Sequence, residues 1–148
     1  MRAGDLAEPF PTVRRDTPAV AAARLMATRN LPGLIVVDGD DCPVTILPGT
    51  QVLRMAIPTY LDDDPTLGRV IDEAAADVFL RGVGDRTVAE CLSHEPRELP
   101  VVDPDTTVLE VAAVMARTRS PLVAVAREKG PLLGAITLDA LLDRMLDT

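Results

Sequence analysis

Aromatic side chains are almost missing from this chain of 148 residues: it has no tryptophan, and Phe, Tyr and Trp together make up 2% of it. Hydrophobic residues nevertheless account for 47% of the chain, so an aliphatic core is available and global disorder is excluded. The shortage of rings also removes the stacking platforms on which proteins hold single-stranded nucleic acid. The composition therefore predicts one compact domain, or two intimate subdomains, with a core of aliphatic side chains.

Positive charge is also scarce, since the formal net charge is −8 at pH 7. Nucleic acid and anionic membrane surfaces both attract basic faces, so neither is an expected partner. No apolar run approaches the roughly 20 residues that a membrane span requires. Residues 1–9 lack the apolar stretch of a signal peptide. We therefore expect a cytoplasmic protein without membrane insertion.

Cysteine and histidine are rare. Two cysteines, Cys42 and Cys91, favour free thiols in a reducing compartment. With His94 as the single histidine and no paired cysteines, zinc sites and His-based catalytic triads are excluded. The acidic run at 62–64 lacks the spaced ligands and the glycine of a calcium loop, so it is interpreted as a solvated run. Because the chain also has no Walker-type phosphate loop, we predict no catalytic residue and no metal site.

The strongest positive feature is a duplication. Residues 11–57 and 100–146 carry the same pattern at a constant offset of 89 residues, as from Asp16 to Asp105, with no gap. The matched positions in the first copy are Pro11, Val13, Asp16, Thr17, Ala23, Met26, Ala27, Pro32 and Val36, and those in the second are Pro100, Val102, Asp105, Thr106, Ala112, Met115, Ala116, Pro121 and Val125. A duplicated small unit usually builds one pseudo-symmetric body, and the clefts between its halves become candidate sites.

Each copy predicts the element order β-α-β-β-α. In the first copy, Asp16 or Thr17 offers the oxygen that caps a helix, whose buried face we place at Val20, Ala23 and Ala27. The predicted elements of the first copy are a strand at 11–13, a helix at 19–28, strands at 34–37 and 44–47, and a helix at 51–57. The predicted elements of the second copy are strands at 99–102, 122–126 and 132–137, and helices opened at Thr107-x-x-Glu110 and at 138–146.

A helical connector is predicted between the two copies, at residues 59–84. Asp64 can cap it, Pro65 suits its first turn, and Gly82 and Gly84 end it. Its apolar stripe either packs on its own module or adds a surface that faces a partner. A second capping box, Thr87-x-x-Glu90, opens a short helix that enters the second copy.

The tandem β-α-β-β-α units resemble a pair of cystathionine-β-synthase (CBS) domains, known as a Bateman module. The resemblance is carried by the run from Asp105 to Ala116 (Asp-Thr-Thr-Val-Leu-Glu-Val-Ala-Ala-Val-Met-Ala) and by the Gly-Ala-Ile-Thr that ends at Thr137, and it covers nearly the whole chain. It implies an α/β fold whose units pack sheet to sheet with pseudo-two-fold symmetry. On this interpretation, residues 1–58 are CBS unit 1, residues 59–84 the connector and residues 85–148 CBS unit 2.

The family implies a function as well. Its members commonly form homodimers, bind adenine nucleotides or related adenosyl compounds such as S-adenosylmethionine between their units, and regulate an attached or separate protein. The family's ligand motif has a Thr or Ser at the end of the third strand and, three residues later, an Asp that holds the ribose. The physical basis is that the strand-to-helix junction directs backbone N–H groups at phosphate, and that a carboxylate accepts hydrogen bonds from a diol.

Both copies depart from that motif. In the second copy Thr137 is present, but Ala140 stands at the Asp position, and the nearest acid is Asp139. One residue along a helix is about 100° of rotation, and an acid in the first turn lies where a phosphate would sit. In the first copy the equivalents of Thr137 and Ala140 are Pro48 and Gln51. Neither corner is therefore a standard nucleotide site.

Each candidate ligand residue has a structural alternative. Thr137 contacts a ligand or is a helix N-cap, and Asp139 contacts a ligand or complements the helix dipole. Gly49 allows close backbone approach, and Thr50 and Gln51 either contact the ligand or serve capping and solvent exposure. The edge before the second strand of each copy lines the cleft in this family, or else serves turn geometry. Its residues are Asn30 and Pro32 in the first copy, and Arg119, Ser120 and Pro121 in the second.

These observations together predict a regulatory module rather than an enzyme. It would be homodimeric, would sense an adenosyl-type ligand, and would modulate a separate effector protein, a transporter or an enzyme. The alternative is an interaction or dimerisation scaffold whose clefts have lost ligand binding, because fold does not imply function.

Overall fold

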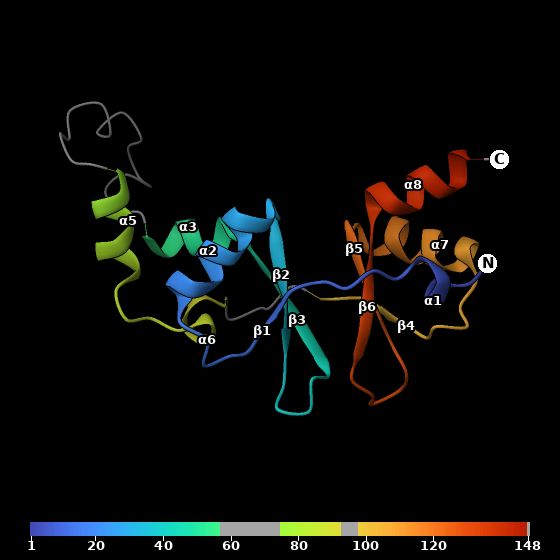
Figure 1. Cartoon of the computed structure of the whole chain (residues 1–148), viewed down its shortest axis with the longest axis horizontal. Helices are drawn as coiled ribbons and strands as arrows, with labels where there is room; N and C mark the ends of the chain where they lie inside the picture. Colours follow the sequence, from blue (N-terminus) through green and yellow to red (C-terminus); the bar gives the residue numbers. More distant parts are fainter. Residues whose placement is uncertain (57–74, 93–97, 148) are drawn as a thin grey trace. The chain divides into compact units, whose positions relative to one another are not determined.

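The computed structural model describes residues 1–56, 75–92 and 98–147 (Figure 1). Its strands form two sheets, with the orders β1-β2-β3 and β4-β5-β6. The elements of the first copy are β1 (Thr12–Val13), α2 (Ala19–Arg29), β2 (Gly33–Val37), β3 (Pro43–Pro48) and α3 (Gly49–Ala56). Those of the second are β4 (Val101–Val102), α7 (Val108–Thr118), β5 (Leu122–Ala126), β6 (Leu132–Thr137) and α8 (Leu138–Leu146). The predicted α/β fold and its element order are therefore confirmed.

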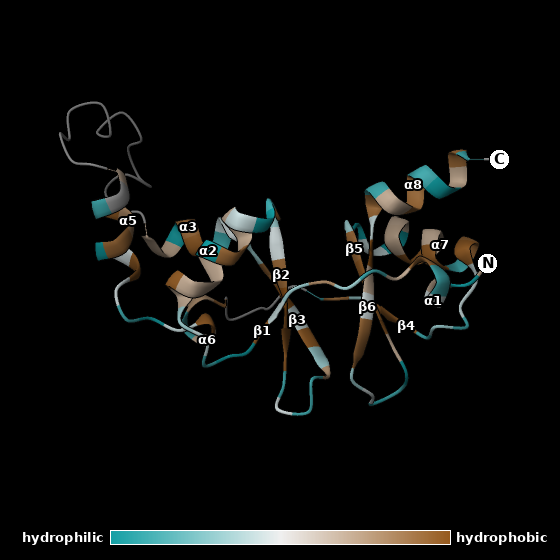
Figure 2. Cartoon of the chain, viewed as in Figure 1, coloured by the Kyte–Doolittle hydropathy of each residue, from teal (hydrophilic) through white to brown (hydrophobic). Residues whose placement is uncertain are grey.

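The second sheet has the connectivity that the pattern predicts. Strand β4 pairs with β5 in parallel, and β5 pairs with β6 antiparallel, with Leu122 opposite Thr137. Helix α7 connects the two parallel strands, as a parallel pair requires. The strands are hydrophobic, whereas the turns that join β2 to β3 and β5 to β6 are hydrophilic (Figure 2).

The chain divides into two compact units. One contains Met1–Thr12, Ile35–Ile46 and Arg97–Thr148, and the other contains Val13–Leu34 and Leu47–Pro96. These units interleave along the sequence, because the first takes in the N-terminal residues and the ends of β2 and β3. The sequence boundaries at 58 and 84 stay a prediction.

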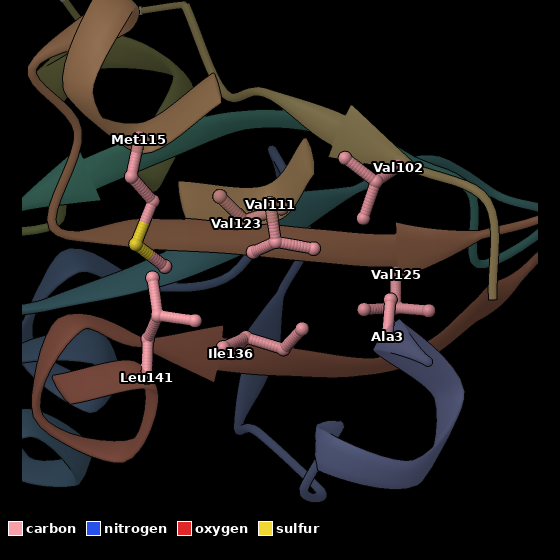
Figure 3. Close-up of a cluster of buried hydrophobic side chains, with 8 residues drawn as sticks. All are labelled: Ala3, Val102, Val111, Met115, Val123, Val125, Ile136 and Leu141. Atoms are coloured by element: carbon pink, nitrogen blue, oxygen red, sulfur yellow. The ribbon is translucent and has the colours of Figure 1, made fainter. Parts of the chain in front are cut away.

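Aliphatic side chains fill the core of the compact unit that contains the second copy, on both faces of the β4-β5-β6 sheet. On one face, helices α7 and α8 bury Met115 and Leu141 against Val123 and Ile136 (Figure 3). On the other face, Ile35 and Val37 of β2 pack with a group from the second copy. That group contains Leu99, Leu122, Ala124 and Ala135. Within this unit, the part of β2 that it contains therefore packs on the face of the second sheet.

A short helix that the sequence pattern did not predict, α1 (Ala3–Leu6), completes the second copy. Ala3 N–H donates to the Thr106 carbonyl at 2.7 Å, and Gly4 N–H donates to the Pro104 carbonyl at 2.9 Å. Ala3 is fully buried in the core beneath α7. The chain then bonds to β6, where Glu8 and Ala135 exchange two backbone hydrogen bonds of 3.0 and 2.9 Å.

Helix α6 (Val88–Cys91) does the same for the first copy. Val88 N–H donates to the Thr17 carbonyl at 2.8 Å, and Ala89 N–H donates to the Arg15 carbonyl at 2.9 Å. These acceptors stand 89 residues before Thr106 and Pro104. Each copy is therefore completed by the helix that precedes the other copy in the sequence. The predicted capping box at the start of α6 is present, since the Glu90 carboxylate accepts the Thr87 N–H at 3.4 Å.

Helix α2 differs from its prediction in two details. Its buried residues are Ala19, Ala22 and Met26, one position before each residue of the predicted face, which corresponds to a rotation of about 100°. The helix is so rich in alanine that both faces look apolar in the sequence. The predicted cap is also wrong, because the Thr17 hydroxyl accepts the Arg14 N–H. The Ala19 N–H instead donates to the Arg86 carbonyl at 2.8 Å.

The described part of the predicted connector is α5 (Ala75–Val83), which packs against α3 and α2 on its own unit. Gly82 lies within the helix rather than at its end. A Cβ there would collide with the Ala56 backbone, so the glycine permits the close approach of α5 to α3. Gly84, with φ of +55°, follows the last turn. The predicted cap at Asp64 and Pro65 lies outside the described residues.

Candidate functional site

The candidate corner of the second copy lies where β6 meets α8. Leu138 N–H donates to the Pro121 carbonyl at 2.9 Å, so the start of the helix is attached to the turn before β5. The Thr137 hydroxyl accepts the Ala140 N–H at 3.2 Å and is the N-cap of α8. Asp139 is exposed in the first turn of the helix. This corner therefore carries a capped helix start beside a carboxylate.

The turn before β5 is held by its own residues. Arg119 ends α7 in the left-handed conformation, with φ of 55°. The Ser120 hydroxyl donates to the Leu122 carbonyl at 2.6 Å and is also 3.3 Å from the Leu122 N–H. Pro121 is exposed. Turn geometry accounts for the hydroxyl of Ser120, whereas the side chain of Arg119 is exposed to solvent.

The equivalent corner of the first copy has the same backbone plan and different side chains. Gly49 N–H donates to the Pro32 carbonyl at 2.8 Å, in register with the bond from Leu138 to Pro121. A Cβ on Gly49 would lie 3.3 Å from both Met26 Sδ and the Pro32 oxygen, so a small residue suits this junction. Asn30, at the position of Arg119, is also left-handed, with φ of 56°.

The chemistry of the two corners differs at the helix start. Pro48 has no side-chain oxygen, so it cannot cap α3 as Thr137 caps α8. Thr50 is exposed where the second copy has Asp139, and Gln51 is half-buried. The first turn of α3 has no acidic residue. The first corner therefore keeps a neutral, amide-bearing helix start, whereas the second presents a negative charge.

Neither thiol is activated as a nucleophile. Desolvation raises the pKa of Cys42, and the carboxylates of Asp38, Asp40 and Asp41 raise it further. Burial and Glu90 raise the pKa of Cys91, against a lowering by Arg86. Because the thiolate is the reactive form, a raised pKa keeps both cysteines protonated at neutral pH.

No group of three or more potential metal ligands occurs among residues 1–56, 75–92 and 98–147. His94 and the acidic run at 62–64 lie outside these residues. None of the described helices is long and apolar enough to cross a membrane.

Known proteins share this architecture. The family model of the CBS domain matches residues 3–54 and 89–147. A CBS domain-containing protein of unknown function from Kribbella flavida is 49% identical and superposes with a TM-score of 0.92 over 99% of both chains. The CBS domain of a CBS domain-containing membrane protein from Sphaerobacter thermophilus is 25% identical, with a TM-score of 0.70 over 97% of this chain and 86% of the other.

A third structure contains a ligand. CBSX2 from Arabidopsis thaliana, solved in complex with AMP, is 20% identical to this chain, with a TM-score of 0.69 over 98% of this chain and 96% of the other. A search of curated proteins finds no match. The family model covers well over half of the chain, in two segments that coincide with the two copies of the duplication. The chain is therefore a member of the CBS-domain family and contains a CBS-domain pair.

Proposed function

We propose that this CBS pair is a regulatory module that binds an adenosyl-type ligand and thereby modulates a separate effector protein, a transporter or an enzyme. The observation that supports this proposal best is the repeated corner geometry. In both copies a backbone hydrogen bond of 2.8 or 2.9 Å attaches the helix start to the turn before the middle strand. The AMP complex of CBSX2 supports an adenine nucleotide as the ligand class.

The proposed binding residues lie on the two edges of each corner. In the first copy, Gly49, Thr50 and Gln51 offer backbone N–H groups and an amide to phosphate or ribose, opposite Asn30 and Pro32. In the second copy, the proposed binding residues are Thr137 and Asp139 at the helix start and Arg119, Ser120 and Pro121 in the turn to which that start is hydrogen-bonded. Asp139 repels phosphate and accepts hydrogen bonds from hydroxyl groups, so this corner suits an adenosyl group without a phosphate at that position.

Regulation follows by linkage if the ligand binds two conformations of the module unequally. Only that difference in affinity can shift an effector between two states. We propose a non-enzymatic, cytoplasmic homodimer. The competing function is a scaffold that binds no ligand. It is favoured because the positions of the motif's Asp are occupied by Gln51 and Ala140.

A melting experiment distinguishes the two functions. The full chain is heated with ATP, ADP, AMP, S-adenosylmethionine, NAD or a cyclic dinucleotide, each at millimolar concentration. A ligand at about 100 times its dissociation constant adds roughly 2.7 kcal/mol to the free energy of unfolding, which raises the midpoint by several degrees. If no compound raises it, the scaffold function is favoured.

Two variants then assign the corner. Gln51→Ala removes the amide of the first corner, and Thr137→Ala removes the hydroxyl of the second. Arg24→Ala, at an exposed position on α2, is the matched control. The shift should shrink in one of the first two variants and persist in the control. An undiminished shift in both would contradict the proposed site.

A further inference from the structure

Two sulfur atoms meet between helices α3 and α6. The Cys91 Sγ of α6 donates to the Met55 Sδ of α3 at 3.5 Å, although the two residues stand 36 positions apart in the sequence. Both belong to the same compact unit, which contains Val13–Leu34 and Leu47–Pro96. The fold of this unit therefore brings a thiol and a thioether together where the sequence has no metal-ligand spacing.

The two sulfur-bearing side chains differ in their exposure to water. Cys91 is 3% exposed, whereas Met55 is half-buried. An ion can therefore approach the pair by way of Met55. The methionine side chain is unbranched, has three rotatable bonds and adjusts easily to its surroundings. Rotation of that side chain can widen the gap between the two sulfurs and admit an ion.

The chemistry of the two ligands selects the metal. Thiolate and thioether sulfurs are soft ligands that favour Cu(I), whereas carboxylate and carbonyl oxygens suit Mg²⁺ and Ca²⁺. Structural Zn²⁺ sites take four ligands, and no group of three or more His, Cys, Asp or Glu side chains occurs among residues 1–56, 75–92 and 98–147. A pair of sulfurs therefore suits Cu(I), which accepts two ligands.

The charge balance at the pair favours a monovalent ion. Burial and the carboxylate of Glu90 raise the pKa of Cys91, against a lowering by Arg86. Because burial disfavours the charged thiolate, an ion of charge +1 suits this thiol, since the resulting complex is neutral. Arg86 Nη1 donates to the Met55 Sδ at 3.9 Å. The Arg86 side chain is exposed, so it can move away when the ion takes the lone pair of that sulfur.

We infer that Cys91 and Met55 together bind Cu(I). On binding, the Cys91 thiol loses its proton to solvent and the thiolate donates an electron pair to the ion, while the Met55 Sδ donates a second pair. The metal keeps its oxidation state. Cys42 is not equivalent, because its Sγ donates to the carbonyl oxygens of Lys129 and Asp40, at 3.5 and 3.9 Å. This inference is independent of the proposed adenosyl ligand.

Anaerobic titration of the full chain with Cu(I), in competition with a colorimetric Cu(I) chelator, tests the site. In a Cys42→Ser background, the chain should bind about one Cu(I) and release about one proton at pH 7, because metal binding deprotonates the thiol. Met55→Leu should raise the dissociation constant about tenfold or more, since even groups that only orient a metal ligand contribute roughly 10–100-fold. Met26→Leu, at a buried position on α2, is the matched control and should leave the constant unchanged.

X-ray absorption at the copper edge identifies the ligands separately. The Cys42→Ser protein should show two sulfur neighbours of the metal, and its Met55→Leu variant should show one. The melting temperature of each variant without metal checks that the fold is retained. Equal affinity in Met55→Leu would show that the thiol alone holds the ion, and persistent binding in Cys91→Ala would place the ion elsewhere. Either result, or a chain that takes up no Cu(I), would overturn the inference.

Discussion

Small residues decide the fit at several places in this molecule, and Gly33 at the start of β2 is one of them. A Cβ at Gly33 would lie 2.9 Å from the Leu47 carbonyl oxygen, closer than van der Waals contact allows, and Gly33 is buried. Gly33→Ala should therefore lower the free energy of unfolding by about 1–3 kcal/mol through overpacking. Urea denaturation measures the change. Gly39→Ala is the control, because no atom lies within 4 Å of its added Cβ, and an equal loss in both variants would contradict the explanation.

The candidate site is also decided by single residues. The sequence predicted both alternatives for Thr137, a ligand contact and an N-cap. The structure assigns the cap by the bond from Ala140, and ligand contact stays a prediction. The positive φ of Arg119 could not be read from residue type, whereas Asn30 is of a type that favours the left-handed conformation. Both conformations follow from the tight connection of each helix to the next strand.

At the scale of elements, the short helix α1 is the main feature that the sequence did not indicate. Four residues have too little periodicity to stand out, and the partners of α1 lie about 100 residues away, as in the bond from Ala3 to Thr106. The signal that could have found it is the acid at Asp5, three residues after Arg2, as Glu90 stands three residues after Thr87, because in both helices this carboxylate accepts the N–H of the residue before the helix.

The burial of Ala3 leads to a test of whether α1 stabilises the second copy. Ala3 is 0% exposed in the core of the second copy, so Ala3→Asp would bury a charge without a partner. We expect a loss of about 3 kcal/mol or more of unfolding free energy. Hydrogen exchange should localise the loss to β6, which bonds to Glu8. Ala21→Asp, at an exposed position on α2, should cost far less. Equal losses would show that α1 does not hold the unit together.

At the scale of the whole molecule, the duplication supplies two copies of one scaffold whose corners have diverged. If the proposed function holds, the copies should bind unequally, because α8 carries Asp139 in its first turn and α3 carries no acid there. Titration calorimetry with the phosphate-bearing ligand that gives the largest melting shift should find about one site per chain. Asp139→Asn should strengthen a second site by removing the repulsion. Two equal sites in the unmodified chain would contradict this explanation.

The amino-acid sequence by itself determined the β-α-β-β-α order, the two copies and the family, because hydrophobic periodicity and the repeat act locally and are written along the chain. It also determined which corner positions diverged, since the offset of 89 residues aligns Pro48 with Thr137 and Gln51 with Ala140. Only the tertiary structure decided which face of the alanine-rich α2 is buried. It also decided that α1 completes the second copy and that α6 completes the first. These outcomes depend on contacts between residues far apart in sequence, where several local alternatives have similar energies and packing selects one of them.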